Sequence, residues 1–160
     1  MTAKLNIRAA IWAGVIAGAV FMMLEMGLVA TVGGDSPWAP PRMIAAMVLG
    51  PGVLPPPATF DIGILMVTMM IHFALSIAYG VLLGWLISRR QAGLAAASVL
   101  GLAFGLLIYF VNFYGFTAVW PWFAMARNGI SIFAHAMFGL VLGASYRMVA
   151  RRHIAISTGE

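Results

Sequence analysis

Charged residues are scarce in this chain. Only 8% of its 160 residues are Asp, Glu, Lys or Arg, and 63% are hydrophobic. A soluble domain carries roughly 25% charged and about 45–50% apolar residues, so an ordinary soluble domain is excluded. The high hydrophobicity excludes intrinsic disorder. Cysteine is absent, which excludes disulfides, thiolate zinc sites, thiol redox chemistry and Cys-ligated iron–sulfur clusters.

Motifs of catalysis and of nucleic-acid recognition are missing as well. The chain has no nucleophile elbow, P-loop, dinucleotide fingerprint or His-Glu-x-x-His motif, so we expect no enzyme. The formal charge of +5 comes from basic residues at the ends of apolar runs and not from a basic patch with interleaved aromatics. We therefore expect no nucleic acid partner.

Long apolar runs are what the sequence has in abundance. Four of them reach the roughly 20 residues that a helix needs to cross a hydrocarbon core, at about 9–32, 62–87, 92–116 and 128–149. We predict an all-α, polytopic membrane protein whose partner is the lipid bilayer. Its four transmembrane helices form a bundle, a single membrane domain over residues 1–160.

The basic residues predict the orientation. Because the number of spans is even, only Arg42 and Arg127 fall on one side. By the positive-inside rule both termini are cytoplasmic. The first run could instead be a secretory signal peptide, but its length, Glu25 and the lack of a small-x-small site before Thr31 argue against cleavage. The seven cytoplasmic basic residues are Lys4, Arg8, Arg89, Arg90, Arg147, Arg151 and Arg152.

The first outer loop predicts a short helix over 42–49. Pro41 suits the first helical position, and Gly50 suits the stop. A helix of this length is too short to span, so it is either interfacial or re-entrant, dipping in as a cap over the bundle. The alternative is a plain connecting loop that its prolines hold stiff.

Each predicted span carries one Gly-x-x-x-Gly spacing. Two glycines four residues apart form a flat stripe that lets helix backbones approach and pack by dispersion. We therefore predict a closely packed inner half of the bundle. The eight glycines are Gly14, Gly18, Gly80, Gly84, Gly101, Gly105, Gly139 and Gly143.

Polar residues share the faces of these glycines. Glu25 follows its second glycine by seven residues, as Asn112 does in the third span, and seven steps return to within about 20° of the same face. His72 and His135 each begin a matching stripe in the second and fourth spans. The spacing is typical of a duplicated helical hairpin.

The same spacing predicts one polar cluster in the outer half, because ionisable groups inside a membrane usually face the bundle interior. Its members are Glu25, His72, Asn112 and His135, with Ser76, Tyr79, Tyr109 and Tyr114 around them.

Four interpretations of this cluster stay open. It is a hydrogen-bonded knot that fixes helix register, or a proton relay or sensor built on imidazole. It is a divalent metal site made by Glu25, His72 and His135, with Asn112 or water completing the shell. Finally, His72 and His135 are axial ligands of a b-type haem, which only the histidine pair suggests.

Two functions from different classes follow. The leading one is a non-catalytic membrane protein whose polar intramembrane site binds an ion, proton or small ligand, in transport or sensing. The alternative is a structural or accessory subunit that packs through its glycine stripes in a homo-oligomer or a larger membrane complex.

The segments 71–86 and 131–147, which contain His72 and His135, resemble matching helices in small bacterial inner-membrane proteins of the YagU-like type. The resemblance implies a multi-pass protein of the bacterial inner (plasma) membrane. In that type the position of Asn112 is matched by histidine, which argues against a three-histidine site here. The segment 36–59 is similar to that of small rhizobial proteins labelled sodium:proline symporter, although four continuous spans could form a transporter of that kind only as an oligomer.

Overall fold

The computed structural model describes residues 4–158, and the side chains of residues 4–151. The described residues form helices and loops with no strand. Among them, four helical segments are long and apolar enough to cross a membrane, which confirms the predicted all-α class with four apolar spans. The segments are α1 (Ile7–Thr31), α3 (Ile62–Arg90), Leu94–Ala118, which begins with α4 (Leu94–Phe110), and the apolar part Gly129–Arg151 of α5 (Gly129–Thr158).

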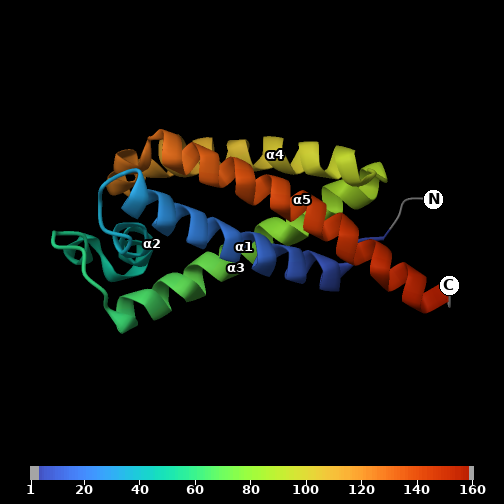
Figure 1. The fold of residues 1–160 in the computed structure, drawn as a ribbon, viewed down its shortest axis with the longest axis horizontal. Helices are drawn as coiled ribbons and strands as arrows, with labels where there is room; N and C mark the ends of the chain where they lie inside the picture. Colours follow the sequence, from blue (N-terminus) through green and yellow to red (C-terminus); the bar gives the residue numbers. More distant parts are fainter. Residues whose placement is uncertain (1–3, 159–160) are drawn as a thin grey trace.

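The four long helices pack side by side in the order α3, α1, α5, α4 (Figure 1). The α4–α5 interface is the most extensive, followed by α1–α5 and α1–α3, whereas α3 and α4 barely touch. The arrangement is therefore an open row of helices. One side of it, between α3 and α4, is left uncovered.

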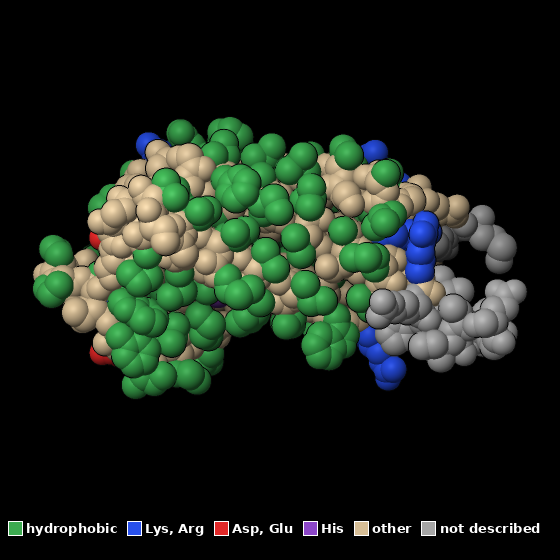
Figure 2. Space-filling model, in the orientation of Figure 1, with side chains coloured by type: hydrophobic (Ala, Val, Ile, Leu, Met, Phe, Trp, Pro, Cys, Tyr) green, Lys and Arg blue, Asp and Glu red, His purple; other side chains and the backbone are tan. Residues whose placement is uncertain are grey.

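Charge is segregated along the long axis of the molecule. Figure 2 shows Lys and Arg gathered mainly at the end where α1 begins and α5 ends, with a broad apolar belt between that end and the other. We name the basic end the inner end and the opposite end the outer end. The side chain of Arg152, one of the seven residues predicted to anchor the inner end, lies outside the described residues.

Helices α1 and α3 pack through glycines in their inner halves. A methyl group added at Gly14 would lie 2.6 Å from the carbonyl oxygen of Ser76, and one added at Gly18 would lie 2.8 Å from Ser76 Oγ. A methyl group at Gly80 would overlap the carbonyl oxygen of Ala10. Only glycine lets these two backbones approach so closely.

Helices α4 and α5 pack in the same way. Gly101 and Gly139 each face the other's carbonyl oxygen, and Gly105 faces that of His135. Gly143 faces the carbonyl oxygen of Ala97. These contacts repeat those of the first hairpin position by position, with Gly101 in the place of Gly14, Gly139 in that of Ser76, Gly143 in that of Gly80 and Ala97 in that of Ala10.

Tyr146 joins the inner ends of three helices. Its ring fills the space beside the eighth glycine, Gly84, at which an added methyl group would lie 2.7 Å from the ring. Its hydroxyl group lies 2.6 Å from Ser88 Oγ in α3, and it accepts a hydrogen bond from the backbone N–H of Asn6 at the start of α1. All eight glycines of the predicted stripes therefore contact other parts of this chain.

The short outer helix exists, but it begins earlier than predicted. Helix α2 spans Ala39–Leu49, and its first turn includes both Pro40 and Pro41. The first N–H groups of a helix have no partner within the helix, so two prolines in that turn cost no hydrogen bond. The helix ends at Gly50, whose φ of 82° suits glycine.

The sequence predicts that the third span is one continuous α-helix, but in the structure the α-helix ends at Phe110. After Phe110 the chain winds into a π-helical turn, η2 (Val111–Gly115), and then into a 3-10 turn, η3 (Phe116–Ala118). Arg127 Nε donates a 2.6 Å hydrogen bond to the Phe113 carbonyl group within this turn. Because a π-helical turn is wider than an α-helical turn, the side chains that follow Phe110, including Asn112, point in directions that a continuous α-helix would not give them.

Candidate functional site

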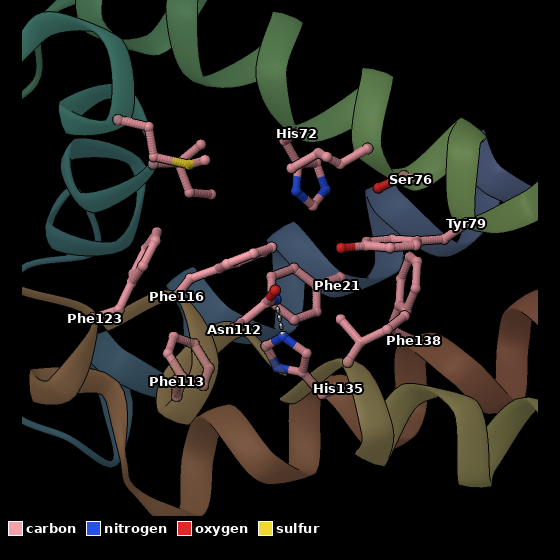
Figure 3. Close-up of a pocket in the computed structure, with 14 residues that line it drawn as sticks. Phe21, His72, Ser76, Tyr79, Asn112, Phe113, Phe116, Phe123, His135 and Phe138 are labelled. Atoms are coloured by element: carbon pink, nitrogen blue, oxygen red, sulfur yellow. Dashed lines mark hydrogen bonds between the residues drawn. The ribbon is translucent and has the colours of Figure 1, made fainter. Parts of the chain in front are cut away.

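A cavity of about 110 Å³ lies between α3 and the outer halves of α1, α4 and α5 (Figure 3). Three of the four predicted cluster residues line it: His72, Asn112 and His135. Two of their predicted neighbours, Ser76 and Tyr79, line it as well. The rest of the lining is apolar: Phe21, Ile44, Met47, Leu75, Ile108, Phe113, Phe116, Phe123 and Phe138.

His72 extends from α3 toward the cavity (Figure 3). Its Nε2 lies 2.9 Å from the carbonyl oxygen of Gly18 in α1, an approach that the missing side chain of Gly18 permits. Because a carbonyl oxygen can only accept, Nε2 carries the hydrogen in the neutral ring. The other ring nitrogen, Nδ1, then carries a lone pair.

His135 extends from α5 on the opposite side of the cavity (Figure 3). Its Nδ1 lies 2.8 Å from the carbonyl oxygen of Ser131 one turn earlier in the same helix, so this nitrogen is the donor. Nε2 is therefore the acceptor, and the Asn112 side-chain amide lies 3.3 Å from it. Both histidines thus use their ring N–H on a backbone carbonyl group. The acceptor nitrogen of His135 is paired with Asn112, whereas that of His72 has no hydrogen-bond partner among the described residues.

Phe21 of α1 lies between the two imidazoles. Its ring stacks on His72 with centroids 5.5 Å apart and meets His135 edge-on at 4.8 Å. The histidines therefore approach each other across an aromatic ring and not directly. This arrangement fixes both imidazoles in position through packing as well as hydrogen bonding.

Glu25 is not part of the cavity lining, contrary to the predicted single cluster. It is 6% exposed, and Ser131 Oγ donates a 2.6 Å hydrogen bond to its Oε1. Its Oε2 has no hydrogen-bond partner among the described residues. The reason is depth: His72 bonds to Gly18, and Glu25 lies seven residues further, about 10 Å along α1. Glu25 is connected to the site only through Ser131, whose carbonyl group holds His135.

The predicted three-ligand metal site is accordingly not assembled. Within the described residues, no group of three or more His, Cys, Asp or Glu side chains is placed so that it could hold a metal ion. The predicted haem site has the wrong dimensions. A cavity of about 150 Å³ holds a single benzene ring, so about 110 Å³ leaves no room for a porphyrin, and Phe21 occupies the space between the imidazoles.

The two remaining predicted neighbours differ from each other. Tyr109 is buried, and its ring centroid lies 5.7 Å from that of His135, although the tyrosine does not line the cavity. Tyr114 lies on the exposed side of the π-helical turn, where the Arg127 guanidinium group stacks 4.5 Å above its ring. Tyr114 therefore stabilises the turn and does not surround the site.

Helix α2 covers the outer end of the cavity, which Ile44 and Met47 line. Its position is fixed from two sides. The buried hydroxyl group of Thr68 in α3 donates a 2.5 Å hydrogen bond to the Pro41 carbonyl group, and Trp122 Nε1 donates a 3.1 Å bond to that of Met43. Arg42 ties α2 to the rest of the outer loop through the Val53 and Thr59 carbonyl groups.

The cavity opens on the uncovered side of the helix row. Two of its lining residues reach the molecular surface there: Leu75 of α3, 41% exposed, and Phe116 of η3, 39% exposed. The sparse contact between α3 and α4 leaves this gap. The outer end, in contrast, is covered by α2.

The apolar lining of the cavity was not predicted from the sequence. One signal for part of it was present: Phe21, Leu75 and Phe138 each lie three residues after Gly18, His72 or His135, and so on nearly the same helix face. Phe113, Phe116 and Phe123 gave no such signal, because they reach the cavity through a π turn and short 3-10 segments. The last of these is η4 (Pro121–Ala126).

No protein-family profile matches this chain, and neither does any curated protein or solved structure.

Proposed function

We propose that this chain is a non-catalytic integral membrane protein that binds a small molecule in the cavity between α3 and α5. One observation carries the proposal. Two histidines face one cavity with their ring N–H groups bound to backbone carbonyl groups, and the Nδ1 lone pair of His72 has no hydrogen-bond partner among the described residues. A purely structural knot would pair this nitrogen too, as Asn112 pairs that of His135, because unpaired polar groups in an apolar interior are costly.

The glycines support a ligand-binding protein over an accessory subunit. A subunit that packs through glycine stripes would present them on its outer surface. Here seven of the eight glycines contact the chain itself in the α1–α3 and α4–α5 interfaces, and the eighth, Gly84 of α3, contacts Tyr146 of α5. The position-by-position match of the two hairpins also supports an origin by duplication, with the site built where the copies meet.

The segregation of charge supports an orientation with the inner end in the cytoplasm, by the positive-inside rule. The outer half, with the cavity and α2, then faces the far side of the membrane, and α2 serves as a re-entrant cap. The bacterial inner membrane and the YagU-like relationship stay predictions.

A fragment-binding experiment with a filled cavity tests the proposal. We would screen fluorinated fragments by ¹⁹F NMR against the protein in lipid nanodiscs, with two variants of α2. Ile44→Trp adds a large side chain at a residue that lines the cavity, whereas Val48→Trp adds the same side chain at an exposed residue of the same helix. We expect fragments that bind the wild-type protein and Val48→Trp but not Ile44→Trp.

The histidines give a second measurement. Fragments that bind the wild-type protein should lose affinity in His72→Ala and in His135→Ala, although both variants stay folded. The proposal is wrong if no fragment distinguishes Ile44→Trp from Val48→Trp, or if both histidine variants bind every fragment as the wild-type protein does.

A further inference from the structure

The cavity has properties that select one class of ligand. Resting on the proposed function, we infer that it binds the hydroxylated ring of a lipid-dissolved amphiphile, which enters sideways from the bilayer between α3 and α4. Ring size, hydrogen bonding and access each contribute a separate argument.

The size and lining of the cavity favour one small ring. A cavity of about 110 Å³ is slightly smaller than the engineered cavity of about 150 Å³ that holds benzene, so it fits one small ring with the rest of the ligand outside. Aromatic side chains surround it and favour edge-to-face contact with such a ring. They are Phe21, Tyr79, Phe113, Phe116, Phe123 and Phe138.

The polar groups of the cavity favour a ligand with a neutral hydrogen-bond donor. The free nitrogen of His72 is an acceptor, so the ligand must bring a donor. No Asp or Glu lines the cavity, and its walls are largely apolar, so nothing compensates a cationic donor. A hydroxyl group is a neutral donor, and it can also accept a hydrogen bond from Ser76 or Asn112.

The position of the opening favours entry of the ligand from the bilayer. Leu75, at the opening, lies thirteen residues from the outer end of α3, which is about 20 Å along the helix at 1.5 Å per residue. At that depth the surface of a membrane-spanning helix faces acyl chains, because the hydrocarbon core is about 30 Å thick. The aqueous route from the outer end is covered by α2, which Thr68 and Trp122 hold in place.

The test uses matched probes in nanodiscs: 4-octylphenol, and 4-octylanisole, which differs only by methylation of the hydroxyl group. The chain has three histidines, so selective ¹³C labelling of histidine rings gives few signals, and those of His72 and His135 report occupancy. We expect 4-octylphenol to bind roughly tenfold more tightly than the anisole, as the loss of one or two hydrogen bonds implies. His72→Leu, which removes the free acceptor nitrogen, should reduce this preference severalfold.

The route is tested with two substitutions on one face of α3. Leu75→Trp narrows the opening, and Leu82→Trp places the same side chain seven residues further, on an exposed site outside the cavity lining. The exchange rate of 4-octylphenol should fall roughly tenfold in Leu75→Trp and stay unchanged in Leu82→Trp. Phenol, which lacks the tail and partitions less into the bilayer, should bind much more weakly at equal total concentration.

The outcomes separate this inference from the proposed function. If fragments still distinguish Ile44→Trp from Val48→Trp but the phenol and the anisole bind equally, the ligand class is wrong and the cavity remains a binding site. Equal exchange rates in Leu75→Trp and Leu82→Trp, or binding of phenol as tight as that of 4-octylphenol, would overturn entry from the bilayer. Failure of the fragment experiment would overturn both.

Discussion

At the scale of single residues, Ser131 links the buried acid to the cavity. Its hydroxyl group donates the one hydrogen bond found for the Glu25 carboxyl group among the described residues, and its carbonyl group accepts from His135. Ser131 therefore contacts both functional candidates, Glu25 through its side chain and His135 through its backbone. The backbone bond to His135 survives truncation of Ser131, so the two roles can be separated.

Truncation of this serine should destabilise the protein. We expect Ser131→Ala to lower the free energy of unfolding by about 1–3 kcal/mol, because it leaves a buried carboxyl group without a partner. Unfolding of the protein in mild detergent, followed by circular dichroism, measures the loss. In the control variant Ser98→Ala, the lost bond is to the Leu94 carbonyl group of the same helix, and we expect a change within about 0.5 kcal/mol. Equal stabilities of the two variants would contradict a structural role for the Glu25–Ser131 bond.

At the scale of helices, carbonyl–glycine contacts determine how closely the helices approach. Six of the eight glycines face backbone atoms of the neighbouring helix, whereas Gly18 faces the Ser76 and His72 side chains and Gly84 the Tyr146 ring. Because backbone atoms cannot rotate away as a flexible side chain can, even a methyl group forces the helices apart. His72 depends on this spacing, since it reaches the Gly18 carbonyl group of the neighbouring helix, where no side chain stands in the way.

Alanine at one of these glycines should therefore be costly. A methyl group at Gly139 would overlap the Gly101 carbonyl oxygen and lie 2.7 Å from the Gly105 nitrogen. We expect Gly139→Ala to lower the free energy of unfolding by about 1–3 kcal/mol through overpacking. Gly27→Ala is the matched control, because nothing lies within 4 Å of an added methyl group there. It should leave stability unchanged or raise it by up to about 1 kcal/mol. The same loss in both variants would contradict the packing explanation, because an added methyl group at Gly27 contacts nothing.

At the scale of the whole molecule, the charges and the apolar belt predict how the chain sits in the bilayer. The natural chain has no cysteine, so an introduced thiol is unique. Gly52 in the outer loop and Gly93 before α4 both have open space at the position of an added Cβ. They lie at opposite ends of the molecule.

Thiol labelling of these two positions tests the orientation. In intact bacterial cells with a permeabilised outer membrane, a membrane-impermeant maleimide should label Gly52→Cys but not Gly93→Cys. Disruption of the inner membrane should make both reactive, which controls for intrinsic reactivity. Labelling of Gly93→Cys alone in intact cells would reverse the predicted orientation.

Much of the architecture follows from sequence because it depends on local pattern. The four apolar runs, the short outer helix and the glycine stripes are each encoded within a few neighbouring residues, whereas the partners that the glycines face are not. The placement of His72 and His135 near each other also followed from helical spacing, and both line one cavity.

Only the tertiary structure decided which polar residues meet. Helical spacing put Glu25 on the correct face of α1, but the depth at which α3 crosses α1 depends on the Gly18–Ser76 contact between segments far apart in the sequence. That contact aligns His72 with Gly18 and leaves Glu25 about 10 Å further out. The apolar lining depends likewise on the π turn near Asn112 and on the folding of α2 over the cavity. The sequence by itself determined the spans and their faces. The contacts between spans determined the relative depth of the helices, and with it the composition of the site.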